Sequence, residues 1–414
     1  MKMAEITSWK KKYDLKELEL NALLEITQAV NNNLPVDSLY KIYRFTLQAN
    51  LKLKKLALYV KDEEFECKAS YGTKVDFNNE PIDESFLQIT EIGLIEDLEN
   101  ISPFNEFDTF IPVYHKDNLL ALVFSESTME EGHEDESTNT NFIQALTNII
   151  IVAIENKKLF RRQKQQKALR RELKIARNVQ QNLFPKELPE EGHLQLFASY
   201  LPHRSVGGDY YDYIPIDDNQ FLICIADVSG KGIPAALLMS NFQASLRTMI
   251  RQTNDPEKII HELNYQTLIN GNGDHFITFF MALYNVMTRE FKYVNAGHNP
   301  PYLCLDNGQI LPLESGTTIL GSFRDLPFLK VGCYTDLSRF CFFSYTDGLI
   351  ETRNSDDEEF GTDKLKDELK DLVDCELKTI HDTIIHALDD FKGIENYIDD
   401  ITIFSCRVNL ITEK

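Results

Sequence analysis

The sequence predicts an α+β protein in which two folded domains are joined by a long helix. The chain has 414 residues, enough for two or three domains. Short apolar runs of strand length alternate with helical patterns over residues 15–155 and again over residues 187–410. The connector between them, residues 156–186, has no glycine and no proline before Pro185, so one helix can cross it unbroken.

The composition narrows the class of protein. A formal net charge of −22 argues against a nucleic-acid surface and against binding to an anionic membrane, and it fits a protein that holds cations. The seven cysteines are scattered and form no CxxC pair, which predicts reduced core thiols rather than a zinc site. Because there is no signal-peptide core and the longest apolar run, residues 149–154, cannot span a bilayer, we expect a soluble cytoplasmic protein without membrane insertion.

The first predicted domain combines helices with strands. Apolar residues at helical spacing predict a helix over residues 15–30, and Leu34-Pro35 separates it from a second helix over residues 37–48. A third helix, from residue 139 to about residue 154, closes the domain. Four strand-like runs lie between the second and third helices, over residues 55–60, 64–69, 109–114 and 119–124.

In layout and size, residues 15–155 resemble a GAF sensor domain. The resemblance implies a sheet with helices on one side and a small-molecule or protein signal that the sequence does not identify. Cys67 is either a chromophore or redox site or a structural thiol, and we interpret it as a buried structural thiol.

The connector has features of a short coiled coil. A heptad seam is formed by Leu169, Leu173, Ala176 and Leu183, and Gln180 interrupts it. Nine lysine and arginine residues between positions 157 and 174 make it strongly basic. We interpret it as a signalling helix that forms a homodimer and whose seam can shift. A solvated rigid spacer and a nucleic-acid contact are the alternatives.

Asp227 lies at the end of an apolar strand, residues 221–226, and is followed by the glycine turn Ser229-Gly230-Lys231-Gly232. Burying an unpaired carboxylate costs several kcal/mol. The carboxylate therefore needs a helix N-terminus or a cation. An N-cap for the helix predicted over residues 235–250 is the simpler alternative.

At three further sites an aspartate likewise lies beside a glycine pair or at the end of an apolar strand. Asp209 follows Gly207-Gly208, Asp347 follows the apolar run of residues 341–345, and Asp399-Asp400 precedes a final strand. Four such sites are hard to explain as separate helix caps. Carboxylate oxygens suit Mg²⁺ or Mn²⁺, and a pair of such ions about 3.5–4 Å apart would activate a water and bind phosphate oxygens. The chain has no P-loop, because Gly230-Lys231-Gly232 is not followed by serine or threonine.

His298, in the turn Asn295-Ala296-Gly297-His298-Asn299-Pro300-Pro301, has two interpretations. It is a catalytic base or a histidine whose hydrogen bonds are satisfied within the turn, and we favour the turn histidine.

Together these segments resemble the SpoIIE-type (RsbU-like) family of metal-dependent type 2C (PPM) protein phosphatases. The resemblance covers about residues 190–408 and rests on five segments in the family's order: Val206–Asp212, Ala226–Gly232, Asn295–Pro301, Tyr345–Glu351 and Asp399–Thr402. Residues 180–185 also resemble the family's regulatory linker. The resemblance implies an α-β-β-α sandwich with two divalent metal ions, Mn²⁺ or Mg²⁺, at one end.

The resemblance also implies a role for individual residues. Asp227 would bridge both metals, the Val228 carbonyl would bind one, and Asp347 and Asp399 would hold the other. Asp209 would act in the outer shell or on a third ion. The nucleophile would be a metal-activated water.

Two positions qualify the transfer of roles from the family. Ser229 stands where distant relatives place a histidine proton donor, so the general acid is unassigned. Arg204 has the spacing of a phosphate-contacting arginine in those relatives, and a surface arginine is the alternative.

The resulting hypothesis is a sensor-regulated serine/threonine phosphatase. Its substrate would be a phosphorylated partner protein of the anti-sigma-factor-antagonist (STAS) type. Helices over residues 235–250 and 256–269 begin beside the metal turn, so a shift of the connector against them would move Asp227 and the Val228 carbonyl. A catalytically inactive scaffold and another two-metal enzyme, such as a nuclease, are the rival hypotheses. The net charge and the lack of basic residues beside the aspartates disfavour the nuclease.

Overall fold

The computed structural model describes residues 2–50, 53–97, 102–126, 136–372 and 375–410. The chain divides into two compact units, Met1–Lys167 and Ala168–Lys414, and the division falls within helix α3 (Glu136–Gln181). The helix predicted to close the first domain therefore does continue through the connector. No described helix combines the length and the apolar character that a membrane span requires.

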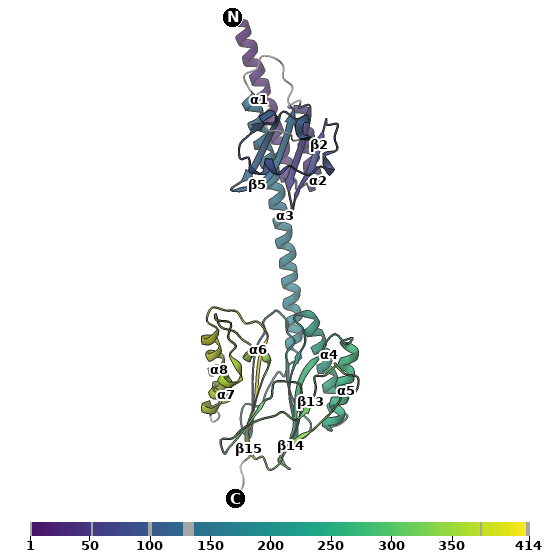
Figure 1. Cartoon of the computed structure of the whole chain (residues 1–414), viewed down its shortest axis with the longest axis vertical. Helices are drawn as coiled ribbons and strands as arrows, with labels where there is room; N and C mark the ends of the chain where they lie inside the picture. The colour runs from purple at the N-terminus through teal and green to yellow at the C-terminus, as the bar shows by residue number, and fades with distance from the viewer. Residues whose placement is uncertain (1, 51–52, 98–101, 127–135, 373–374, 411–414) are drawn as a thin grey trace. The chain divides into compact units, whose positions relative to one another are not determined.

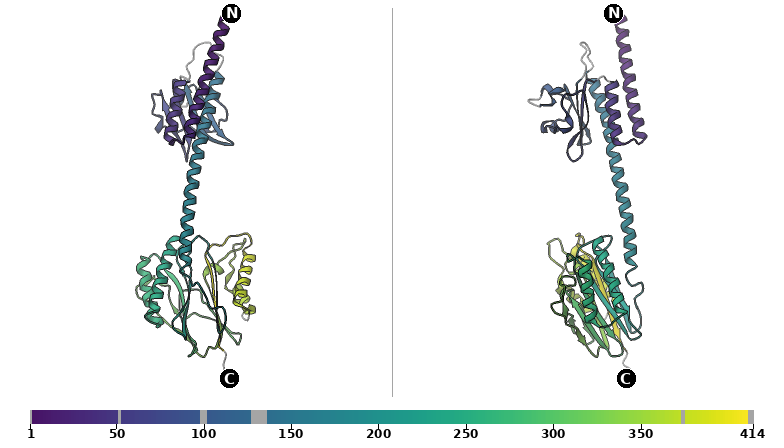
Figure 2. Two further views of the ribbon diagram at one scale, coloured as in Figure 1. Left: turned by 180° about the vertical axis from the view of Figure 1, so that it is seen from behind. Right: turned by 90° about the vertical axis from the view of Figure 1, so that its right-hand side faces the viewer.

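The first unit is an antiparallel sheet with helices on one face. Its strands run in the order β2-β1-β5-β4-β3. They are β1 (Lys55–Lys61), β2 (Phe65–Tyr71), β3 (Gly93–Leu94), β4 (Thr109–His115) and β5 (Asn118–Glu126). Helices α1 (Lys2–Asn31) and α2 (Val36–Asn50) pack with the first part of α3 on one side of this sheet (Figure 2). The predicted layout is confirmed, and the two-residue strand β3 is an element that the sequence pattern did not indicate.

The other face of this sheet is covered by aromatic side chains. Short 3₁₀ helices, η1 (Phe77–Asn79), η2 (Glu84–Gln88), η3 (Ile95–Asp97) and η4 (Phe104–Glu106), bring phenylalanines onto it. They join Tyr59 and Phe124 in a closed cluster in which Phe86 and Phe124 meet edge to face with ring centroids 4.8 Å apart. Cys67 packs against the same cluster, and burial raises the pKa of its thiol to about 11. This agrees with a structural thiol.

The second unit has four layers, helix, sheet, sheet and helix. One sheet has the order β13-β10-β9-β8-β7, with β14 paired to β10, and the other has the order β12-β11-β15-β16-β6. Helices α4 (Ile233–Ile250) and α5 (Pro256–Asn270) cover the first sheet, and α7 (Gly361–Leu372) and α8 (Leu377–Lys392) cover the second (Figure 1). Separate apolar clusters fill the three spaces between the layers. The predicted α-β-β-α sandwich is confirmed.

The strands of the first sheet are β7 (Tyr210–Pro215), β8 (Gln220–Val228), β9 (Ile277–Asn285), β10 (Glu290–Ala296), β13 (Gly316–Thr317) and β14 (Gly332–Tyr334). Those of the second are β6 (Leu194–Leu201), β11 (Tyr302–Leu305), β12 (Ile310–Pro312), β15 (Arg339–Tyr345) and β16 (Ile401–Asn409). One-turn helix α6 (Asp347–Ile350) follows β15. All seven cysteines are free, and Cys224, Cys304, Cys341 and Cys406 are buried, as the sequence predicted.

One expectation from the sequence is wrong, and one alternative is excluded. Leu183 is not part of the heptad seam, because α3 ends at Gln181 and Leu183 packs on the α4 side of the sandwich instead. Asp227 does not cap a helix. It lies within β8, and Gly232 is the N-cap residue of α4.

Candidate active site

The acidic residues singled out in the sequence meet at one end of the sandwich. Strand β8 is antiparallel to β7, so Asp227 near the end of β8 and Asp209 just before β7 lie at the same sheet edge. Strand β15 is antiparallel to β16, which likewise brings Asp347 to the Asp399-Asp400 pair. Both groups lie at the same end of the sandwich, since Thr346 and Thr402 of the second sheet's segments hydrogen-bond Asp209 and the charges of Asp347 and Asp399 act on Asp227.

Asp227 is the centre of this group. Burial, followed by the charges of Asp347 and Asp399, raises the pKa of its carboxyl to about 7. Burial and the charge of Asp399 also raise the pKa of Asp347. These shifts place Asp227, Asp347 and Asp399 within range of one another, which is the convergence that the sequence predicted. These raised pKa values indicate that negative charge is in excess at this end of the sandwich.

Asp209 lies beneath this group and is 1% exposed. Its Oδ2 accepts hydrogen bonds from Thr346 Oγ1 at 2.9 Å and from Thr402 Oγ1 at 2.5 Å. Burial and the adjacent Asp227 raise its pKa well above the ordinary value. Asp209 thus joins the two sheets through the threonines and lies beside Asp227; its outer-shell role stays a prediction.

The loop that precedes Asp209 packs directly on Asp227 and its neighbour. A Cβ atom on Gly208 would lie 2.7 Å from the Val228 carbonyl oxygen and 3.5 Å from Asp227 Oδ1. The carboxylate of Asp400 accepts hydrogen bonds from the Gly208 amide at 3.0 Å and from the His203 amide at 2.7 Å. Asp400 therefore holds the glycine loop, a role that the sequence did not indicate.

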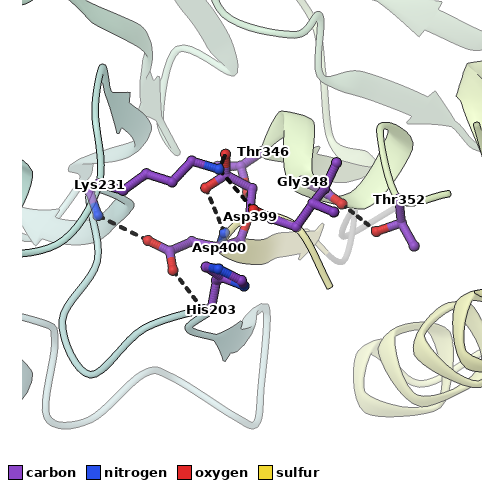
Figure 3. Close-up of polar contacts among 9 residues, drawn as sticks. His203, Lys231, Thr346, Gly348, Thr352, Asp399 and Asp400 are labelled. Carbon is purple, nitrogen blue, oxygen red and sulfur yellow. Dashed lines mark hydrogen bonds and ion pairs between the residues drawn. The ribbon is translucent and has the colours of Figure 1, made fainter. Parts of the chain in front are cut away.

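Lys231 supplies a positive charge at the rim of the site. Its Nζ lies 2.6 Å from Asp399 Oδ2 and donates to the Ile398 carbonyl oxygen at 2.8 Å (Figure 3). Gly230 and Gly232, on either side of it, have φ values of 94° and 77°, so the turn needs glycine at both positions. Arg204 is exposed beside Gly232, with its guanidinium 3.8 Å from where a Cβ of Gly232 would lie.

His298 is buried in its turn. Its backbone amide donates to Asn295 Oδ1 at 2.8 Å, and its Nδ1 lies 2.9 Å from Thr278 Oγ1. Burial lowers the pKa of its imidazole to about 4, so the ring is neutral at pH 7. The amide contact holds His298 in its turn, but the ring is not satisfied within it, because Thr278 belongs to β9 and the buried Nε2 has no hydrogen-bond partner among the described residues.

The donor set fits hard divalent cations in its chemistry. Carboxylates of Asp227, Asp347 and Asp399 converge beside the Val228 carbonyl, and oxygen donors of this kind suit Mg²⁺ or Mn²⁺. Among the residues that the structure describes, no group of three or more His, Cys, Asp or Glu side chains is arranged so that it could hold a metal ion. Because Asp399 forms an ion pair with Lys231, binding of a metal to the paired oxygen of Asp399 would require this ion pair to break.

Comparison with known proteins agrees with this geometry. Residues 217–409 match the family described as Stage II sporulation protein E (SpoIIE). Phosphoserine phosphatase RsbU of Bacillus subtilis (strain 168) is 32% identical over 189 residues, which are 45% of this chain and 56% of that protein. Phosphoserine phosphatase RsbP of the same organism is 29% identical over 236 residues, 56% of each chain. This chain thus spans about half the length of the curated relatives it matches.

A solved structure supports the fold independently. The SiaA-PP2C domain of Pseudomonas aeruginosa superposes with a TM-score of 0.53 at 23% identity, over 59% of this chain and 99% of that domain. The second unit therefore has the fold of a PP2C-type phosphatase domain.

Proposed function

We propose that this chain, whose second unit is related to the SpoIIE/PP2C-type phosphatase domains, is a metal-dependent protein serine/threonine phosphatase. The observation that carries the proposal is the group of Asp227, Asp347 and Asp399, in which burial and neighbouring carboxylates raise the pKa values of Asp227 and Asp347 and Lys231 pairs with Asp399. A buried excess of carboxylates costs stability unless a cation binds there.

The residues of the chain have separate tasks in this proposal. Asp227, Asp347, Asp399 and the Val228 carbonyl would hold two divalent ions, Mn²⁺ or Mg²⁺. When bound, the ions lower the pKa of a water molecule and neutralise the phosphate oxygens. Asp209 orients Asp227 from below, and Lys231 and Arg204 lie where the dianionic phosphate of the substrate would approach.

The substrate class follows from the relatives. Two curated relatives are named phosphoserine phosphatases. We propose that this chain hydrolyses phosphoserine or phosphothreonine on a partner protein, of the anti-sigma-factor-antagonist type. The leaving alkoxide must be protonated, and no side chain is assigned to that step.

The experiment is Mn²⁺-dependent hydrolysis of a phosphoserine peptide by the full chain. The wild type should release phosphate only with Mn²⁺ or Mg²⁺, and Asp347→Asn should not. Binding of a phosphoprotein without turnover by the wild type would favour the inactive scaffold instead. The Lys231–Asp399 ion pair is the observation on which that second candidate rests.

Regulation is proposed for the first unit and the connector. The GAF-like first unit would receive a signal, and α3 would pass it on as the seam of a homodimer. Leu169, on the predicted seam, is 56% exposed on α3, and a second copy of the helix would cover it. Leu169→Lys should then reduce the mass measured by light scattering from dimer to monomer, and an unchanged mass would contradict the dimer.

A further inference from the structure

Gln180, in the last turn of α3, has an environment unlike that of its neighbours. Its side chain is 6% exposed, whereas Val179 is 61% exposed and Gln181 is also exposed. Burial alone does not stabilise a glutamine side chain at the end of a basic, solvated helix, because its amide is polar. A buried amide needs hydrogen-bond partners, and the partners identify its role.

Both ends of the Gln180 amide bind one residue of the glycine loop. Its Nε2 donates to the Gly207 carbonyl oxygen at 2.8 Å, and its Oε1 accepts from the Gly207 amide at 3.3 Å. The side chain thereby pairs with Gly207 as a neighbouring strand would. A leucine at this heptad position would continue the apolar seam, but it could not form the two hydrogen bonds to the backbone of Gly207.

The glycine loop has little freedom on its other sides. A Cβ on Gly207 would lie 2.1 Å from Asp400 Oδ2 and 2.3 Å from Tyr200 Oη. The next residue, Gly208, donates its amide to Asp400 and packs on the Val228 carbonyl. A displacement of the Gly207 backbone would therefore also move Gly208, which packs on the Val228 carbonyl, and Asp209, which follows Gly208 in the chain.

We propose that Gln180 is a positioning residue that fixes the glycine loop against the Val228 carbonyl and so sets the metal affinity of the site. The inference rests on the proposed function and deepens it by naming a direct route from the connector helix to the metal ligands. This route does not depend on α4 or α5. One residue of rotation in α3 turns a side chain by about 100°, which would remove both hydrogen bonds to Gly207 at once.

The test uses the full chain with Gln180→Met, which keeps the size of the side chain and removes both hydrogen bonds. The matched control is Gln181→Met, the exposed neighbour on the same turn. We expect Gln180→Met to weaken Mn²⁺ binding in calorimetry by about tenfold, as the loss of two hydrogen bonds predicts. Amide exchange in peptides covering residues 203–209 should accelerate, and Gln181→Met should match the wild type in both measurements.

Other outcomes separate the possible failures. A Gln180→Met chain that unfolds at lower denaturant but keeps wild-type Mn²⁺ affinity and exchange rates would show a purely structural residue and overturn the inference. Metal binding that weakens while kcat at saturating Mn²⁺ recovers would support positioning. A wild type that binds no Mn²⁺ would contradict the proposed function, and amide exchange would then decide alone whether Gln180 fixes the loop.

Discussion

Asp212 on β7 and Asp227 on β8 are two carboxylates of the first sheet that are both largely removed from solvent. They differ in the charges of the side chains around them. Asp212 is fully buried and receives Arg247 Nε and Nη2 at 2.8 Å each, the Tyr213 amide at 2.9 Å and the Tyr210 hydroxyl. Asp227 has four other acids near it, Asp209, Asp347, Asp399 and Asp400, and burial followed by the charges of Asp347 and Asp399 raises the pKa of its carboxyl to about 7. The chain thus supplies a cation for Asp212, whereas the proposed function has Asp227 bind one from solution.

The largest expected effect is on turnover. Asp227→Asn removes the carboxylate central to the metal site, and phosphopeptide hydrolysis should fall by at least about a hundredfold. Asp218→Asn, an exposed acid in the β7–β8 turn, is the matched control and should leave the rate unchanged. Equal turnover by wild type and Asp227→Asn would contradict the proposal that Asp227, unlike Asp212, binds a catalytic metal ion.

The second prediction concerns the paired acid. Arg247→Met leaves the carboxylate of Asp212 buried without its cation, and the free energy of unfolding should fall by about 2–3 kcal/mol. Urea unfolding measures this, with exposed Arg251→Met as the control. Mn²⁺ affinity of the folded variant should stay within about twofold of wild type, a difference worth less than half a kcal/mol. A large loss of metal affinity would mean that the two acids are not separate in function.

The third prediction is a pH dependence of the metal-free protein. The folded-state pKa of Asp227, about 7, exceeds its unfolded value of about 3.9, so the folded state holds the proton more tightly. This contribution to stability is complete below about pH 4 and is lost as the pH rises through about 7. Urea midpoints at several pH values should show the loss, which Mn²⁺ should reverse and Asp227→Asn should reduce. Stability that is flat from pH 4 to 8 in the metal-free wild type would argue against the shift.

The smallest effect is expected at the rim. Lys231 is partly exposed and pairs with Asp399, so the pair contributes up to about 1 kcal/mol. Lys231→Met should free Asp399 and tighten Mn²⁺ binding by up to about fivefold. Weaker Mn²⁺ binding by this variant in calorimetry would show that Lys231 supports the metal site rather than competing with it.

The strands of the second unit follow from local sequence pattern, whereas its layers were implied by the family resemblance. Apolar runs such as that of β8 give the strands, and antiparallel pairing places the start of one strand beside the end of the next. The sequence pattern placed Asp209, Asp227, Asp347 and Asp399 at strand ends or glycine turns, and the family resemblance implied that they meet at one end. Arg204 is exposed near the same turn, and its contact with phosphate stays a prediction.

Contacts between distant segments could not be predicted in the same way. Lys231 pairs with Asp399, and Asp400 binds the amides of His203 and Gly208, through approaches that only the closed sandwich creates. Gln180 gave a signal, a polar residue interrupting an apolar seam, but its partner Gly207 lies beyond the end of the helix. The hydroxyls of Thr346 and Thr402 bind Asp209 from the second sheet, and nothing in their local sequence distinguishes them from ordinary strand threonines.

Calorimetric titration of the metal-free full chain with Mn²⁺ tests the central claim most directly. The wild type should take up Mn²⁺ saturably with more than one ion per chain, Asp227→Asn should lose this uptake, and Arg247→Met should keep it. Identical titrations of wild type and Asp227→Asn, whether both bind or neither does, would contradict a metal centre formed by these carboxylates.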